Sequence, residues 1–216
     1  MIPRPFIIAV DGPTASGKGT IAKALAAHFG VPHLDTGLLY RAVGRQVFLD
    51  GGNPDDPVDA LAATSFPEGL LRDPELRSEA TGGLASRVSI HPAVRAALLE
   101  RQQAFAAQPG GAVLDGRDIA TVIAPQAEAK LFVTASVAAR AQRRFLEMQQ
   151  DGRAVTLAAI EADLAARDER DRTRAAAPLV RAEGAALLDT SDLSRDDAIA
   201  TAIALVEAQL GRNTAD

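Results

Sequence analysis

Short, largely apolar runs alternate with longer stretches of helical periodicity along most of the chain. The runs have the length and composition of buried strands and lie at 6–10, 31–35, 112–115, 130–133 and 185–189. Elsewhere apolar residues recur at every third or fourth position, which predicts helices over about 19–29, 39–49, 92–105, 137–148, 156–164 and 195–210. Strands that alternate with helices favour a parallel sheet. The sequence therefore predicts an α/β fold: a five-stranded parallel sheet with helices on both faces.

Residues 52–83 depart from this pattern. Asp56 and Pro57 are residue types found at a helix start, and Val58 and Leu61 supply a thin apolar face. Prolines and glycines at 67, 69, 74, 82 and 83 then interrupt any longer element. The stretch also lacks the period-two alternation of a half-buried strand. We expect a mobile excursion from the core here.

Composition narrows the class of protein. A chain of 216 residues with 47% apolar residues can bury one substantial core, so we expect a single domain with small insertions. The chain has no cysteine, which excludes disulfides and cysteine-ligated metals. No apolar segment approaches the roughly 20 residues of a membrane span, and no signal peptide pattern is present. We therefore expect a soluble, cytoplasmic protein that does not bind a membrane.

The net charge of −5 argues against a nucleic-acid partner, which usually requires a broad basic face. Any anionic ligand must therefore be bound by local clusters of arginine side chains.

The clearest chemical signal follows the first strand. Gly12, Gly17 and Lys18 have the G-x-x-x-x-G-K spacing, in which backbone N–H groups surround phosphate oxygens and the lysine reaches the outer phosphates. The next helix directs its positive end at the same anion. The hydroxyl after the lysine comes one place late, at Thr20, a form similar to that of nucleoside monophosphate kinases. We expect a nucleoside triphosphate donor on Gly12, Pro13, Thr14, Ala15, Ser16, Gly17, Lys18, Gly19 and Thr20.

Charged residues also follow two other predicted strands. Arg41 falls in the first turn of the helix after the second strand, and Arg117 and Asp118 come directly after the strand at 112–115. In a parallel sheet these positions lie at the edge where ligands gather. A solvated arginine and a structural ion pair remain the alternatives for them.

A run of arginines prolongs the apolar stripe of the helix that begins at Thr156. Arg167, Arg170 and Arg174 follow one another at steps of three and four, interleaved with acids, and the run stops before Pro178. A solvated helix with ion pairs would explain such a run in most proteins. Since these arginines continue the apolar stripe that faces inward, the run is also consistent with a helical arm that folds over bound phosphates.

The three histidines carry no comparable signal. His28, His33 and His91 fall at a predicted helix end, in a strand and at a helix start. None stands beside a partner acid at a motif position, so we expect no acid–base role for them.

Together these motifs resemble the bacterial cytidylate kinases, in the order of that family and over most of the chain. The phosphate loop alone is common to a large superfamily, whereas the GRD tripeptide at 116–118 and the RDxRDRxR pattern at 167–174 are more specific. The resemblance implies a P-loop kinase fold in one kinase domain spanning 1–216. Within it, the core would comprise 1–37, 96–150 and 175–216, with an acceptor-binding region at 38–95 and a lid at 151–174.

The resemblance also assigns roles to residues. The acceptor phosphate would be bound by Thr36, Arg41, Arg117 and Arg174, the cytosine by Ser86, Arg95 and Asp118, and the ribose by Arg167 and Asp171. The catalytic groups would be Lys18, Arg117, Arg170 and Arg174, with Arg170 approaching the donor from the lid.

The implied reaction transfers the γ-phosphoryl group of ATP to CMP or dCMP, giving CDP or dCDP. Mg²⁺ would arrive with ATP, with Thr20 reaching it through water and no other protein ligand assigned. An acceptor phosphate is already a nucleophile, so positioning and charge neutralisation suffice. The lid and the segment after Asp50 are expected to close over the nucleotides, and the protein to be a monomer.

One departure and three alternatives remain. Longer family members carry a three-stranded antiparallel sheet in the acceptor-binding region, and we expect it to be reduced or absent here. Its loss bears on how completely the acceptor nucleoside is enclosed and on how sharply CMP is preferred over UMP. The alternatives are another P-loop kinase, acting on UMP or on an acceptor such as shikimate, a non-catalytic nucleotide-binding module, and a structural protein.

Overall fold

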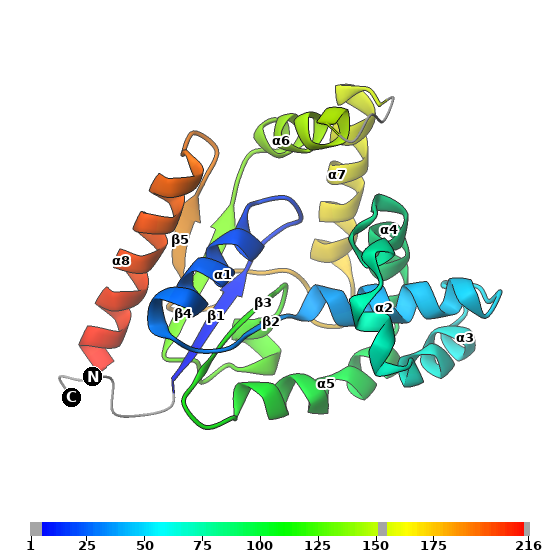
Figure 1. Ribbon diagram of the computed structural model, residues 1–216, viewed down its shortest axis with the longest axis horizontal. Helices are drawn as coiled ribbons and strands as arrows, with labels where there is room; N and C mark the ends of the chain where they lie inside the picture. Colours follow the sequence, from blue (N-terminus) through cyan, green and yellow to red (C-terminus); the bar gives the residue numbers. More distant parts are fainter. Residues whose placement is uncertain (1–5, 151–154, 214–216) are drawn as a thin grey trace.

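A five-stranded sheet forms the centre of the protein, as described by a computed structural model covering residues 6–150 and 155–213. Its strands are β1 (Ile7–Asp11), β2 (His33–Asp35), β3 (Ala112–Gly116), β4 (Ala129–Thr134) and β5 (Ala186–Asp189). They lie in the order β2-β3-β1-β4-β5, and every neighbouring pair is parallel (Figure 1). The predicted fold class is confirmed.

Helices fill most of the remaining chain (Figure 1). The α-helices are α1 (Lys18–Phe29), α2 (Thr36–Leu49), α3 (Pro57–Ala62), α4 (Glu79–Val88), α5 (Pro92–Ala106), α6 (Val137–Gln150), α7 (Leu157–Thr173) and α8 (Arg195–Asn213). Short turns of other helix types are η1 (Ala63–Ser65), η2 (Glu68–Arg72), η3 (Pro74–Arg77) and η4 (Ile119–Ile123). Asp56 and Thr156 cap α3 and α7, as the sequence predicted. Since α2 begins at Thr36, Arg41 lies in its second turn rather than its first.

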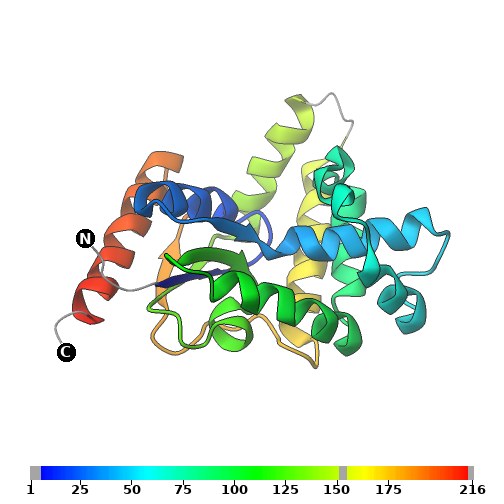
Figure 2. The same ribbon diagram turned by 60° about the horizontal axis from the view of Figure 1, so that its bottom comes forward.

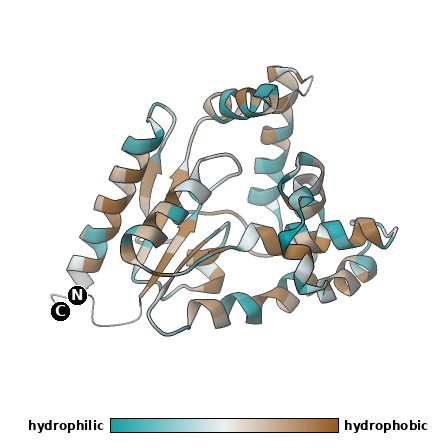
Figure 3. Ribbon diagram, in the orientation of Figure 1, coloured by the Kyte–Doolittle hydropathy of each residue, from teal (hydrophilic) through white to brown (hydrophobic). Residues whose placement is uncertain are grey.

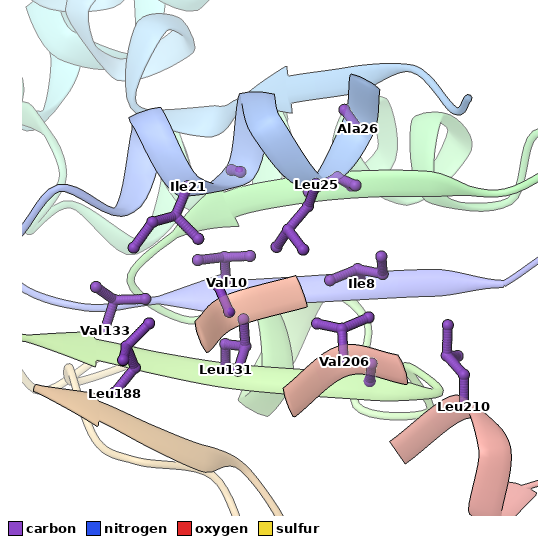
Figure 4. Packing of buried hydrophobic residues seen from close by; sticks show 14 of the residues in the cluster. Ile8, Val10, Ile21, Leu25, Ala26, Leu131, Val133, Leu188, Val206 and Leu210 are labelled. Atoms are coloured by element: carbon purple, nitrogen blue, oxygen red, sulfur yellow. The ribbon is translucent and has the colours of Figure 1, made fainter. Parts of the chain in front are cut away.

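Alternate residues of the central strand pack on opposite faces of the sheet. Ile8 and Val10 belong to a cluster that includes residues of α1 and α8, and Figure 4 shows Val206 and Leu210 of α8 in it. Ala9 belongs to the cluster on the other face, with residues of α5 and η4. Both faces are therefore covered, which explains why the strand is apolar from Ile7 to Val10, before its last residue, Asp11.

The acceptor-binding region predicted at 38–95 has a hydrophobic cluster of its own, formed mainly by α2, α4 and α5. Residues 52–83 contain helices and turns and no strand, so the expected absence of the antiparallel sheet is confirmed. Helix α4 was not predicted, because Gly82 and Gly83 disfavour a helix there. Tertiary packing overrides that preference. A Cβ atom at Gly44 of α2 would lie 2.7 Å from the Cβ of Leu84, so α4 packs directly on the α2 backbone.

Helices α6 and α7 form a fourth, smaller cluster around Ala141, Ile160 and Leu164. Both views place α7 beside α4, across from the sheet (Figure 2). Residues 151–154, at the start of the predicted lid, lie outside the described residues. Polar and apolar positions alternate along the helices (Figure 3), and no helix in the described ranges has the length and apolarity needed to cross a membrane.

Candidate active site

The loop between β1 and α1 has the backbone that the glycine spacing predicted. Gly12 has φ of 156°, and a Cβ atom there would lie 2.0 Å from the carbonyl oxygen of Val133. Gly17 has φ of 86° and precedes the first residue of α1, Lys18. Both positions therefore require glycine. The resulting strand, tight loop and helix N-terminus form a ready anion-binding site.

Two cavities meet at Lys18. The first, of about 540 Å³, is lined by residues 15–20 of the loop together with groups from α6, from the turn before α8 and from the start of α8, among them Arg143, Arg144 and Arg195. The second, of about 190 Å³, lies between the ends of β2 and β3, the acceptor-binding region and α7. It also contains Thr14 and Gly19 of the loop. A ligand in each cavity would thus have its reacting end near the same ammonium group.

The second cavity brings together all the residues predicted to bind the acceptor: Thr36, Arg41, Ser86, Arg95, Arg117, Asp118, Arg167, Asp171 and Arg174. Three other predicted residues lie elsewhere. Gly12 and Pro13 line neither cavity, although the Pro13 carbonyl lies 3.5 Å from Lys18 Nζ. Arg170 also lines neither, and its Nε donates to Ser86 Oγ at 3.2 Å. Arg170 therefore lies against the residue predicted to read the base, away from the phosphate loop.

Ion pairs already connect several of these groups. Arg117 Nε donates to Asp171 Oδ2 at 2.7 Å, and Arg95 pairs with Asp118. Burial alone would raise the pKa of Asp171, but the charge and hydrogen bond of Arg117 outweigh it and lower that pKa. Arg174 Nη2 lies 3.8 Å from Asp118 Oδ1 and is buried without a hydrogen-bond partner. An unsatisfied buried donor beside a polar cavity is suited to a ligand oxygen.

Cations outnumber acids around Arg41. Its Nη1 donates to the carbonyl oxygens of Leu76 and Ser78 at 2.7 and 2.9 Å. Burial, and then the nearby charge of Arg167, lower its pKa to about 10. The pKa of Arg167 is itself lowered, by burial and then by Arg117. This cluster of guanidinium groups generates a field that favours an anionic ligand.

Two carboxylates face each other at the ends of β2 and β3. The pKa of Asp35 is raised by burial and then by the charge of Asp115. His33 Nε2 lies 2.7 Å from Asp115 Oδ1, which corrects the expectation that no histidine adjoins an acid of a motif. No local pattern indicates this pair, because its members are 82 residues apart. Among residues 6–150 and 155–213, no group of three or more His, Cys, Asp or Glu side chains could hold a metal.

The sequence analysis also missed Arg140 of α6. Its Nη1 donates to the Thr14 carbonyl and to Asp168 Oδ1, both at 3.1 Å, and its Nε donates to Ala135 O at 2.9 Å. It thereby links the phosphate loop to α7. Arg140 shares one stripe of the helix predicted at 137–148 with Val137, Arg144 and Met148, and an arginine buried on such a stripe requires a buried partner.

Helices α6 and α7 contact α4 through charged groups. Glu79 of α4 pairs with Arg144, and its Oε2 lies 3.9 Å from Arg167 Nη1. Arg167 Nη2 also donates to the Gly82 carbonyl at 3.3 Å. Arg144 lines the first cavity and Arg167 the second, so a single carboxylate lies between groups from both.

The sequence has extensive similarity to known proteins. The family described as cytidylate kinase matches residues 8–208. A cytidylate kinase of Xanthobacter autotrophicus is 55% identical over 94% of this chain and 98% of its own length. Those of Granulibacter bethesdensis and Caulobacter sp. are 56% and 51% identical, over 93% and 96% of this chain and 96% of their own lengths.

Proposed function

Because the chain belongs to the cytidylate kinase family, whose members phosphorylate CMP to CDP, we propose that it transfers the γ-phosphoryl group of ATP to CMP and dCMP between its two cavities. The observation that carries this proposal is the convergence in one cavity of nine predicted acceptor residues, from five separate segments, beside Lys18. Groups so distant in sequence would not meet there by chance.

The first cavity supports the donor assignment. The loop at 12–20 takes the triphosphate, and the cavity continues past it toward Thr190 and Arg195, leaving space for the nucleoside. The Lys18 side chain is half-buried at the junction. Desolvation, and then the charge of Arg117, lower its pKa to about 8, so the group stays mostly charged at neutral pH. A cation at this point would stabilise the phosphoryl group during its transfer.

The carboxylates fit a magnesium ion that arrives with ATP. Mg²⁺ is typically held by one or two carboxylates together with substrate phosphates. Asp35 and Asp115 both line the second cavity near Lys18, and Asp115 Oδ2 faces Gly19 of the loop. We assign these two residues to the ion, with Thr20 reaching it through water. The bound ion would neutralise charge on the phosphates.

The second cavity supports the acceptor assignment. Asp118 and Arg95, paired with each other, and Ser86 offer the polar groups that distinguish the exocyclic amine of cytosine from the carbonyl of uracil. Arg167 and Asp171 would bind the ribose, and Thr36, Arg41, Arg117 and Arg174 the phosphate. Thr36 Oγ1 donates to the Asp115 carbonyl at 2.8 Å, which fixes its direction.

Catalysis then requires positioning and charge neutralisation alone. The acceptor phosphate attacks the γ-phosphorus in line, without a general base. Lys18 lies where the cavities meet, Arg117 is close to it, and Arg174 lines the second cavity beside Asp118. To contact the donor, Arg170 has to give up its hydrogen bond to Ser86 and bind a phosphate oxygen when both nucleotides are bound. We also propose that the enzyme is a cytoplasmic monomer.

Steady-state kinetics over a panel of acceptors tests the function. With ATP and Mg²⁺, we expect kcat/KM to be highest for CMP, next for dCMP, and roughly a hundredfold lower for UMP and AMP. ADP release is the readout, and shikimate is included as a non-nucleotide acceptor. Faster turnover of UMP, AMP or shikimate would assign the protein to another kinase class. Nucleotide binding without turnover would make it a binding module.

We further propose that α6 and α7 move relative to α4, with Glu79 stabilising the closed arrangement. The chain has no cysteine, so Val58→Cys and Ala166→Cys, both at exposed positions, provide a unique pair of label sites. We expect the distance between the labels to shorten when ATP and CMP bind together. Glu79→Gln should lengthen it in the nucleotide-free protein and raise the apparent Kd of both nucleotides about fivefold, because the competent state is less populated.

The matched control is Glu169→Gln, which removes an exposed carboxylate that pairs with Arg172 on α7. It should leave the distance and both Kd values unchanged. If the distance stayed constant when both nucleotides bound, the closing motion would be refuted. An unaltered distance in the Glu79 variant would remove the role assigned to that residue.

A further inference from the structure

Asp11 is a buried acid to which the proposed reaction gives no role. It is the last residue of β1, directly before the phosphate loop, and only 2% of its surface is exposed. Its Oδ1 accepts a hydrogen bond from the backbone N–H of Ile119, and its Oδ2 accepts one from Ala120, both at 2.8 Å. Each oxygen of the carboxylate therefore binds one backbone amide more than 100 residues away.

These two amides begin η4, directly after the residues that line the acceptor cavity. Arg117 and Asp118 lie between two fixed points of the backbone. On one side Gly116 pairs with Asp11 in the sheet, and on the other Asp11 binds the first two amides of η4. The turn that follows is wide, with Ala124 N–H donating to Ile119 O at 2.7 Å. The backbone that carries Arg117 and Asp118 is thus fastened at both ends to one residue of β1.

The ionised form suits this arrangement best. A carboxylate offers an acceptor to each of the two N–H groups, whereas a protonated acid directs its own O–H toward one of them. Burial raises the pKa of Asp11 to about 6, against the two hydrogen bonds, which lower it. The charged groups that face it are Asp118, which raises its pKa, and Arg117, which lowers it. A residue needed only to fill space would be more stable as an apolar side chain.

We propose that Asp11 is a positioning residue for the acceptor nucleotide, an inference that rests on the proposed function. Its carboxylate fixes the loop at 116–118 so that Arg117 points at the acceptor phosphate and Asp118 at the base. Because Asp11 also begins the phosphate loop, it sets the separation between the two substrates.

Asp11→Asn tests this role through a split between substrates. An amide keeps the size of the side chain but directs an NH₂ group at one of the two N–H donors, so one hydrogen bond to a charged group is lost. We expect KM for CMP to rise at least about tenfold, the effect of one such bond, and KM for ATP to change less than twofold. Ile8→Ala, in the same strand and fully buried, is the control for a general loss of stability. It should lower Tm without changing the ratio of the two KM values.

A titration of the wild-type protein followed by NMR provides a second test that needs no activity. The amide shifts of Ile119 and Ala120 should move together with a midpoint near pH 6, as the carboxylate that accepts from them is protonated. Asp118→Asn should retain this titration and Asp11→Asn should lose it. If Asp11→Asn does not fold, the wild-type and Asp118→Asn titrations decide the question.

The outcomes separate this inference from the proposed function. An Asp11→Asn enzyme with normal KM for CMP, or Ile119 and Ala120 amides that do not titrate together near pH 6, would overturn the role of Asp11 while CMP phosphorylation stands. A wild-type enzyme inactive on CMP would overturn the function, whatever the amides do.

Discussion

Lys18→Ala is expected to lower kcat roughly a thousandfold while the protein stays folded. The ammonium group lies where the two cavities meet, and its contact with the Pro13 carbonyl, at 3.5 Å, is too long to engage it strongly. It is therefore available to the phosphoryl group in transfer, and its loss leaves developing charge without a partner. Single-turnover kinetics with ATP and CMP, together with circular dichroism and Tm, provide the measurement.

The same lysine predicts a pH dependence. Since its pKa is lowered to about 8, raising the pH through that value removes the proton and the charge. We expect kcat/KM to decline above about pH 8 in the wild type. Lys130→Ala, which removes a lysine of β4 outside both cavities, is the control and should retain activity and the same profile. Near-normal turnover by the Lys18 variant would show that phosphoryl transfer does not depend on this group.

Arg117→Met is expected to impair both catalysis and stability. The guanidinium lines the acceptor cavity and binds Asp171 at 2.7 Å, and both side chains are largely buried. Its removal leaves Asp171 as an unpaired buried charge, which should lower the free energy of unfolding by about 3 kcal/mol. The loss of a phosphate contact should also lower kcat/KM for CMP roughly a thousandfold. Denaturant unfolding and steady-state kinetics measure the two effects separately.

A double variant distinguishes the two consequences. Arg117→Met combined with Asp171→Leu removes both charges, so stability should largely return while activity stays low. Since the folded-state pKa of Asp171 lies below its unfolded value of 3.8, the wild-type pair contributes stability above about pH 4 and loses it as the pH falls below. Arg117→Met and the double variant should both lack this loss of stability at low pH. Arg172→Met, which breaks the exposed pair with Glu169, should change neither property. If the single variant were as stable as the wild type, the ion pair would have no structural role.

The elements of this fold that the sequence predicted are those with local signals. The phosphate loop depends on Gly12 and Gly17, whose spacing is set by backbone geometry within a few residues. The three central strands, β1, β3 and β4, were recognisable because burial makes most of their positions apolar. Helix α4 was missed for the opposite reason. Its stability comes from contact with α2 at Gly44, which no local pattern reports.

The candidate site likewise has a part that the sequence predicted and a part that it did not. Motifs and the family resemblance together selected the acceptor residues, and the structure places them in one cavity. The hydrogen-bond and ion-pair partners of these residues could not be predicted, because they come from distant segments of the chain. The strand predicted at 6–10 stops before Asp11, and nothing in the sequence indicates that Asp11 binds amides 108 and 109 residues away. Arg170 was expected near the donor, but the proximity of Ser86, 84 residues earlier, could not be inferred from spacing.

The close approach of α4 to α2 at Gly44 has a consequence for product release. Arg41 is on α2 and Ser86 on α4, so the close contact of the two backbones keeps the proposed phosphate-binding group and the proposed base-reading group at a fixed separation. A monophosphate would bind both groups at once. The diphosphate made from it is one phosphoryl unit longer and would not keep its terminal phosphate at Arg41 and its base at Ser86 together, which would favour its release over a second round of transfer.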